Sequence, residues 1–280
     1  MQIYIGVDGG GSGCRAAVGL GDAAPVGFGA AGPANVFSDF DGAIGNVRSA
    51  IGQAVAQAGV APNASATARV HLGLAGVLDA AMAQRVAQAL GGDPRVTDDR
   101  PTMLAGALGG GEGALAAIGT GSFVARRCGG DLRAVGGWGL VLSDEASGAW
   151  LGRALLAETL AAQDGMVGAT ALTRDTLAHF GTPSDVVAFA ASAAPHAFAV
   201  FAPSVVAAAQ AGDVTAVRLM TRGADWIEQA LLATGADPAE PLCLTGGLGT
   251  AYVDYLTKPW HLADPIGTAL DGALILAREQ

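Results

Sequence analysis

Two glycine-rich turns, one in each half of the 280-residue sequence, have the composition of phosphate-binding loops. Glycines let a backbone approach a bulky anion closely, and successive amide groups can form a nest that binds it. An aspartate beside such a turn would repel phosphate unless a divalent cation lay between them, which is how Mg²⁺ is usually held. The other interpretation of the first turn is a plain hairpin with an Asp-Gly turn. The two turns are Asp8-Gly9-Gly10-Gly11-Ser12-Gly13 and Gly119-Thr120-Gly121-Ser122.

Acidic residues at two further places could act on a hydroxyl-bearing substrate. Asp98 and Asp99 follow a short predicted strand, and a carboxylate there could accept a proton from a substrate hydroxyl. The pair could instead cap the helix expected just beyond it. Asp144 and Glu145 come soon after Trp138, and a flat aromatic ring beside carboxylates suits sugar hydroxyls. Acids at a helix start also favour the helix dipole, which is the alternative for this second pair.

The remaining motifs favour a nucleotide site built from opposed loops over a P-loop or a dinucleotide fold. A third glycine-rich segment follows a short apolar strand, and an adenine could lie against its backbone; it reads Thr245-Gly246-Gly247-Leu248-Gly249. A P-loop is excluded because the single lysine, Lys258, is followed by Pro259. A GxGxxG pattern at 27–32 runs into Pro33 and opens no helix, so it lacks the context of a dinucleotide site.

Composition and charge exclude several classes of partner. The formal net charge is −10 and the 15 basic residues are scattered, so nucleic acid and anionic membranes are poor partners. No apolar run reaches the roughly 18–20 residues of a membrane span, and we expect no signal peptide. The three cysteines form no CxxC pair and the four histidines show no ligand spacing, so we expect neither disulfides nor zinc. These features predict a cytoplasmic protein.

A pattern of three strands with a polar, glycine-rich first turn occurs in each half of the chain and predicts a duplicated α/β architecture. We expect two related domains, 1–109 and 110–266, facing each other over a cleft, with a hinge near Gly109-Gly110-Gly111 and the helix 267–280 packing back on the first domain. Glycine-rich turns are common, so coincidence is the alternative. Predicted strands are 2–7, 14–19, 25–29, 69–74, 95–97, 114–118, 123–127, 131–135 and 242–245. Predicted helices are 41–58, 80–90, 101–109 and 267–278, with alanine-rich helical stretches over 146–235.

Together these segments resemble the phosphate-1, phosphate-2 and adenosine motifs of the sugar kinase/Hsp70/actin superfamily. From residue 5 to residue 277 the sequence is similar to the BadF/BadG/BcrA/BcrD ATPase family, in particular its N-acetylglucosamine kinase and glucosamine kinase members. The most specific matches are 9–16, Gly32-Pro33-Ala34-Asn35, and Gly136-Gly137-Trp138-Gly139 followed by Asp144-Glu145. The resemblance implies an actin/hexokinase-like (ribonuclease H-like) duplicated two-domain fold with a central cleft, and ATP with Mg²⁺ as cofactors.

The resemblance also implies a role for each matching position. Asp8 would hold Mg²⁺ with its water shell. Asp99 would be the base facing the 6-hydroxyl, since its distance from Gly119 fits the family pattern better than that of Asp98. The sugar would be bound by Asn35, Asp99, Thr120, Trp138 and Asp144. ATP would be bound by Gly9, Gly10, Gly11, Ser12, Gly119, Thr120, Gly121, Ser122, Gly246 and Gly247.

One segment departs from the family pattern. The family usually has Gly-Asp-Glu-Gly-Ser where this chain has Ser143-Asp144-Glu145-Ala146-Ser147. Loss of two glycines could shift the backbone of a substrate loop, so a weakly active sugar-binding protein is one alternative. The activase branch of the family holds an iron–sulfur cluster between subunits with cysteines from each. This chain's cysteines lie beside the expected nucleotide loops instead, which disfavours that branch.

The predicted function is phosphorylation of the 6-hydroxyl of an amino sugar by ATP. An acidic cleft suits a cationic glucosamine, and Cys14-Arg15-Ala16 is closer to glucosamine kinases, so glucosamine is favoured over N-acetylglucosamine. The alternative is an ATP-binding activator or sensor of the BadF type without sugar kinase activity. We expect a homodimer with a small-molecule sugar substrate.

Overall fold

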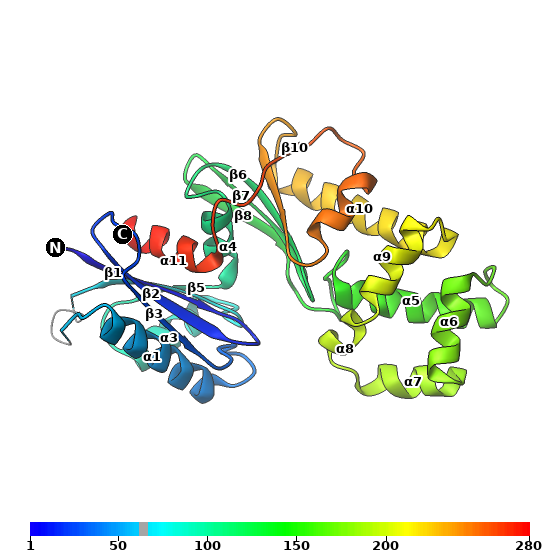
Figure 1. Cartoon of the computed structure of the whole chain (residues 1–280), viewed down its shortest axis with the longest axis horizontal. Helices are drawn as coiled ribbons and strands as arrows, with labels where there is room; N and C mark the ends of the chain where they lie inside the picture. Colours follow the sequence, from blue (N-terminus) through cyan, green and yellow to red (C-terminus); the bar gives the residue numbers. More distant parts are fainter. Residues whose placement is uncertain (62–66) are drawn as a thin grey trace. The chain divides into compact units, whose positions relative to one another are not determined.

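The computed structural model describes residues 1–61 and 67–280, which form two compact units (Figure 1). The first contains 1–112, 127–132 and 264–280, and the second contains 113–126 and 133–263. The first unit therefore extends to residue 112 and the second ends at residue 263. The sequence had placed these boundaries after residues 109 and 266. Residues 127–132 group with the first unit because the Gly129 amide donates to the Glu112 carboxylate at 2.7 Å and Arg127 pairs with Glu279 at 2.9 Å.

A five-stranded mixed sheet forms the centre of the first unit, in the order β3-β2-β1-β4-β5. β1 is antiparallel to β2 and parallel to β4, which is parallel to β5. Ile5 and Val7 of β1 and Leu72 and Leu74 of β4 are at most 2% exposed, as expected for central strands covered on both faces. The strands are β1 Ile3–Gly9, β2 Cys14–Leu20, β3 Gly27–Ala31, β4 Arg69–Leu74 and β5 Arg95–Thr97.

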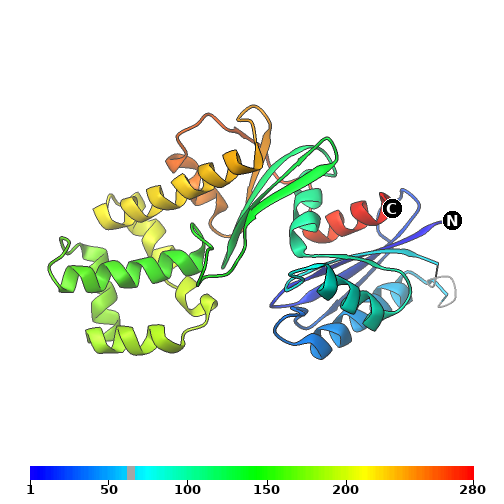
Figure 2. The ribbon, with the colours of Figure 1, turned by 180° about the vertical axis from the view of Figure 1, so that it is seen from behind.

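Helices cover both faces of this first sheet (Figures 1 and 2). α1 (Phe40–Gln57) and α3 (Ala80–Leu90) lie on one face, and α4 (Asp99–Ala107) and α11 (Ala269–Arg278) lie on the other. Glycines allow α4 and α11 to pack closely, because a Cβ at Gly272 would lie 1.9 Å from the carbonyl oxygen of Thr102. α4 begins at Asp99, two residues before the predicted start at Pro101, because Asp98 caps it.

The sheet of the second unit has the order β10-β9-β6-β7-β8. Matched strand by strand, β6 to β10 occupy the places that β1 to β5 occupy in the first sheet, so the duplication seen in the sequence is present in the topology. β9 is parallel to β6 and to β10. The strands are β6 Gly113–Ile118, β7 Ser122–Cys128, β8 Asp131–Gly136, β9 Pro241–Thr245 and β10 His261–Leu262.

The alanine-rich stretch folds into a set of helices that share one core with the second sheet. Leu219, Ile227 and Leu231 of the long helix α10 are fully buried in this core. Within residues 1–61 and 67–280, no single helix is long and apolar enough to cross a membrane. The helices are α5 Gly148–Gln163, α6 Ala171–Phe180, α7 Pro183–Ser192, α8 Pro195–Ala199, α9 Ala202–Gln210, α10 Val214–Thr234 and the 3₁₀ helix η1 Gly249–Tyr255.

Candidate active site

The first glycine-rich turn follows β1 at the edge where the parallel strands of the first unit end. The Asp8 side chain is 16% exposed, and its carboxylate pairs at 2.5 Å with the guanidinium of Arg15, which lies opposite it on β2. The Gly10 amide donates across the turn at 2.9 Å and closes it. Within the described part of the chain, the amides of Gly11 and Ser12 have no intramolecular partner and can bind an anion.

Asn35 lies beside this turn, between β3 and α1. Its two sequence neighbours donate backbone hydrogen bonds to the Gly10 carbonyl at 2.9 Å and to the Ala75 carbonyl, just after β4, at 3.0 Å. The Asn35 Oδ1 accepts from the amides two and three residues further along, at 3.0 and 3.2 Å. Its side-chain NH₂ has no partner among the described residues, so Asn35 offers a substrate a donor, with its oxygen already occupied.

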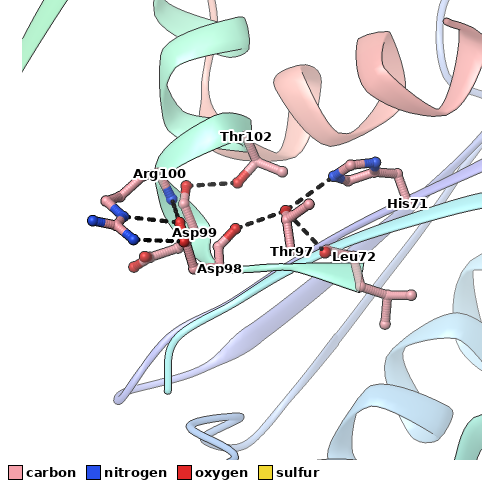
Figure 3. A network of polar contacts seen from close by, with 7 residues as sticks. All are labelled: His71, Leu72, Thr97, Asp98, Asp99, Arg100 and Thr102. Atoms are coloured by element: carbon pink, nitrogen blue, oxygen red, sulfur yellow. Dashed lines mark hydrogen bonds and ion pairs between the residues drawn. The ribbon is translucent and has the colours of Figure 1, made fainter. Parts of the chain in front are cut away.

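Asp98 and Asp99 have different surroundings at the start of α4 (Figure 3). The Asp98 carboxylate accepts from the Arg100 amide at 2.8 Å and pairs with its guanidinium at 2.8 Å. Asp99 makes no ion pair with any residue that the structure describes. Burial raises the pKa of the Asp99 carboxyl, and the negative charges of Asp98 and, less strongly, Asp8 raise it further. An unpaired carboxyl with a raised pKa can serve as a general base.

The second turn connects β6 to β7 and is tied to the start of α5. The Gly119 amide donates to the Gly121 carbonyl at 2.9 Å. The first amides of α5 donate to the turn, from Gly148 to the Gly119 carbonyl at 2.8 Å and from Ala149 to the Thr120 carbonyl at 3.2 Å. The side chain of Thr120 is exposed, so its hydroxyl is available to a ligand.

Asp144 lies in a loop before α5, which begins at Gly148, so the predicted position at the helix start is wrong. The Asp144 residue is 7% exposed, and its Oδ1 accepts from the Gly139 amide at 3.2 Å. A Cβ at Gly121 would lie 2.8 Å from its Oδ2, so a side chain there would displace the carboxylate. Burial raises the pKa of Asp144, and the backbone hydrogen bonds it accepts oppose that increase.

Trp138 is connected to this carboxylate through the backbone, because the next residue, Gly139, donates the hydrogen bond to Asp144. The indole is 65% exposed, and Val141 and Leu142 nearby are 88% and 82% exposed. The segment therefore presents a flat apolar surface to solvent beside a buried carboxylate.

The bend at 245–249 follows β9 and packs on the end of β6. Gly246 has φ +80°, and a Cβ there would lie 2.3 Å from the Ile118 carbonyl oxygen. The Leu248 amide donates to the same oxygen at 3.1 Å. A Cβ at Gly247 would meet no atom within 4 Å, so that backbone is open to a ligand.

Two predicted phosphate-binding residues have structural roles in the described chain. A Cβ at Gly9 would lie 2.6 Å from the Leu74 side chain, so this glycine is required by packing. Ser122 is 3% exposed, and its hydroxyl donates to the Glu145 carbonyl at 2.5 Å. Its side chain is therefore committed to holding the loop before α5.

His71 on β4 supports Asp98 and was not identified from the sequence (Figure 3). The Thr97 hydroxyl donates to the Asp98 carbonyl at 2.8 Å, and the His71 Nε2 lies 3.2 Å from that hydroxyl and hydrogen-bonds to it. Burial, aided by the charge of Arg95, lowers the pKa of His71 to about 4, which keeps the ring neutral. The signal in the sequence is one polar residue within a buried, apolar strand.

Comparison with known proteins places this arrangement among ATP-dependent enzymes. The sequence profile of the BadF/BadG/BcrA/BcrD ATPase family matches residues 5–259. The chain is 34% identical over 283 aligned residues to the glucosamine kinase GspK of Vibrio cholerae, covering 99% of this chain and 96% of that protein.

Solved structures have the same architecture. A crystal structure of a candidate N-acetylglucosamine kinase from Chromobacterium violaceum is 32% identical, with a TM-score of 0.85 and 99% of each chain covered. A ROK family glucokinase from Streptomyces griseus in complex with glucose and AMPPNP is 18% identical, with a TM-score of 0.57 over 99% of this chain and 100% of the other. These matches confirm the predicted actin-like, two-domain α/β fold. The protein therefore belongs to the BadF/BadG/BcrA/BcrD ATPase family, as its motifs predicted.

Proposed function

We propose that this protein is an ATP-dependent kinase that phosphorylates the 6-hydroxyl of an amino sugar, with glucosamine favoured over N-acetylglucosamine. The full-length similarity to the glucosamine kinase of Vibrio cholerae supports the substrate class. The observation that carries the chemistry is the pair Asp8 and Asp99 at one edge of the first sheet. One carboxylate lies beside free amides, and the other is unpaired with a raised pKa.

ATP would be bound by the two turns and the 245–249 bend. The free amides of Gly11 and Ser12 suit phosphate oxygens, the Thr120 hydroxyl can add a hydrogen bond, and the open backbone at Gly247 suits the adenosine. Gly9 and Ser122 would act by fixing the shape of their turns, because their own contacts are internal.

Mg²⁺ fits the residues of the first turn. Among the described residues, no group of three or more His, Cys, Asp or Glu side chains could hold a metal ion. Mg²⁺ rarely needs such a cage, because it usually keeps several waters and binds one or two carboxylates together with substrate phosphates. Asp8 would supply that carboxylate, exchanging its ion pair with Arg15 for the hydrated ion. The metal would neutralise charge on the phosphate oxygens.

The amino sugar would be bound by residues of different chemistry. The Asn35 NH₂ would donate to a hydroxyl oxygen, while Asp144 would accept from hydroxyls or pair with an ammonium group. Trp138 offers a flat face for the apolar side of a pyranose ring. Because burial disfavours the charged form of Asp144, a cationic glucosamine would stabilise that form more than a neutral N-acetyl sugar would.

Asp99 would take the proton of the 6-hydroxyl during transfer. Phosphoryl transfer passes through a loose transition state, so the protein mainly positions the groups and stabilises charge. The raised pKa brings Asp99 closer to the working pH, which improves a general base. Asp98 has no such freedom, because its carboxylate is held by Arg100.

A coupled ADP-release assay with Mg·ATP tests this proposal. Glucosamine should stimulate ADP release more than N-acetylglucosamine or glucose, and phosphorus NMR of the product should show a phosphate ester on the 6-oxygen. If no hexose or amino sugar raises ADP release above the rate with ATP alone, the kinase proposal fails. A rise in Tm with Mg·ADP would then leave the activator or sensor as the better explanation.

A further inference from the structure

The loop at 143–147 holds two residues in an unusual backbone conformation. Asp144 and Ala146 have φ +64° and +68°, and they are the only non-glycine residues with positive φ in the described chain. Alanine is disfavoured there because its Cβ crowds the following carbonyl oxygen. Glycine has no such penalty, because it lacks a Cβ. Something outside the loop must therefore maintain this conformation.

Tyr252 of η1 supplies a hydrogen bond at that point. Its hydroxyl donates to the Ala146 carbonyl at 2.7 Å, across 106 residues of sequence. Both residues are fully buried, so no water competes for the bond. Burial also raises the pKa of Tyr252, so the hydroxyl keeps its proton and remains a donor.

The packing around Tyr252 fixes the direction of this hydroxyl. Gly223 of α10 lies against the phenol ring, where a Cβ would be 2.5 Å from the hydroxyl oxygen. The Ser122 hydroxyl donates to the neighbouring carbonyl, that of Glu145. Two adjacent carbonyls of the loop are thus held by two side chains, close to the Asp144 carboxylate that lies beside Gly121.

We propose that Tyr252 is a positioning residue for substrate binding: its hydroxyl holds the strained backbone at Ala146, and so fixes the carboxylate of Asp144 for the sugar. The role of Asp144 rests on the proposed function, whereas the anchoring of the loop does not. Because the ring of Tyr252 stays packed when only the hydroxyl is lost, the effect should be confined to the 143–147 loop.

Tyr252→Phe tests the proposal in kinetics, with Tyr255→Phe as the matched control. Tyr255 lies on the same 3₁₀ helix, is half-buried, and makes no side-chain hydrogen bond in the described structure. We expect Tyr252→Phe to raise the KM for the sugar by about tenfold, the loss typical of a buried acceptor left unsatisfied. The KM for Mg·ATP should stay within about twofold. The proposal would be overturned if Tyr252→Phe had the wild-type KM for both the sugar and Mg·ATP, whether or not its Tm fell.

Amide hydrogen exchange tests the anchoring without any substrate. In Tyr252→Phe, amides over 143–149 should lose protection while those of β6 and α10 keep it. Unchanged protection over 143–149 would overturn the proposal even if the protein is an active kinase. If the wild type phosphorylates no amino sugar, the proposed function fails, and the exchange result still decides whether Tyr252 anchors the loop.

A second substitution tests whether backbone strain is what the hydroxyl opposes. Glycine at position 146 adopts φ +68° freely, so Tyr252→Phe with Ala146→Gly should recover the part of the lost sugar affinity and protection that comes from backbone strain, while the carbonyl at 146 still lacks its donor. The double variant also keeps the test usable if Tyr252→Phe alone is insoluble. A double variant as impaired as, or more impaired than, Tyr252→Phe would overturn the strain part of the proposal.

Discussion

The two glycine-rich turns occupy equivalent places in two sheets of the same strand order, but they are supported differently. The first turn is open at its tip: a Cβ at Gly11 would meet no atom within 4 Å, and the Asp8 carboxylate has one exposed partner, Arg15. Its base is held by the Ala34 amide, which donates to the Gly10 carbonyl. The second turn is held on several sides, by amides of α5 and by the 245–249 bend.

This difference indicates that the two units of the duplicated fold have different roles. The first unit carries two acidic groups for the proposed metal ion and base: Asp8, which can exchange Arg15 for the ion, and Asp99, which has no ion-pair partner among the described residues. The second unit carries a network of buried carbonyls and hydroxyls around Asp144, which suits precise placement of a ligand. The predictions below test whether the two regions differ in this way.

The largest effect is expected from Asp99 in the first unit. Asp99→Asn keeps the size of the side chain and removes the proton acceptor, so kcat should fall by about 10²-fold or more, with little change in KM. Asp98→Asn should leave kcat nearly unchanged and lower stability by less than about 1 kcal/mol, because asparagine caps a helix as well as aspartate and only the partly exposed ion pair with Arg100 is lost. Full activity in Asp99→Asn would show that Asp99 is not the general base.

Gly246 and Gly247 form a matched pair in the second unit. Gly246→Ala places a Cβ against the Ile118 carbonyl and requires φ +80°, so stability should fall by roughly 2 kcal/mol and ATP binding should weaken. The Cβ that Gly247→Ala adds would meet no atom within 4 Å, so this variant should have the Tm of the wild type. Thermal unfolding with and without Mg·ADP measures both. Equal Tm values for the two variants would contradict the tight support described for the second turn.

His71 should make the first unit sensitive to acid. Its pKa is about 4 in the folded protein and near 6.5 when unfolded, so the unfolded state binds more protons between these values. Stability should therefore fall as the pH drops from about 6.5 to 4, by up to about 3 kcal/mol. His71→Gln should flatten this part of the profile in urea unfolding. His196→Gln, at an exposed site, is the control and should leave the profile as in the wild type.

Asp8 tests the metal-binding role assigned to the open turn. Asp8→Asn should raise the Mg²⁺ concentration needed for half-maximal activity by about tenfold or more, as expected for a group that orients bound metal and water. Arg15→Ala removes the partner that competes for Asp8 and should not raise that Mg²⁺ requirement. A Mg²⁺ dependence unchanged in Asp8→Asn would exclude this carboxylate as the metal-binding group.

The smallest effect is expected from Ala146→Gly by itself. Removing the Cβ relieves backbone strain at φ +68°, and this should exceed the added entropy of the unfolded chain, raising stability by about 0.5 kcal/mol. Ala207→Gly, at an exposed position within α9, should instead lower stability by about 1 kcal/mol. A loss of stability in Ala146→Gly would show that the 143–147 loop is not strained.

Predictions from the sequence were accurate where short-range patterns decide the structure. The alternation of apolar residues and the glycines between them located most strands within about two residues, and the repeat of the pattern predicted the shared strand order. The start of α4 was predicted two residues late, because Pro101 is a strong signal and the Asp98 side chain, which accepts from the Arg100 amide, caps the helix before it. Residues 127–132 belong to the first unit because they contact Glu112 and Glu279, which are far away in sequence.

The sequence by itself determined the chemistry of this protein: which turns have free backbone, which residues are acidic, and which family they match. These properties are local, because glycine content and residue type act over a few positions. Tertiary structure decided which atoms remain available, since burial and partners arise from segments distant in the chain. It buried Asp99 without an ion-pair partner, occupied the hydroxyl of Ser122 and brought Tyr252 to Ala146. The bonds that hold Asp98 and the Asn35 oxygen come instead from residues two or three positions away.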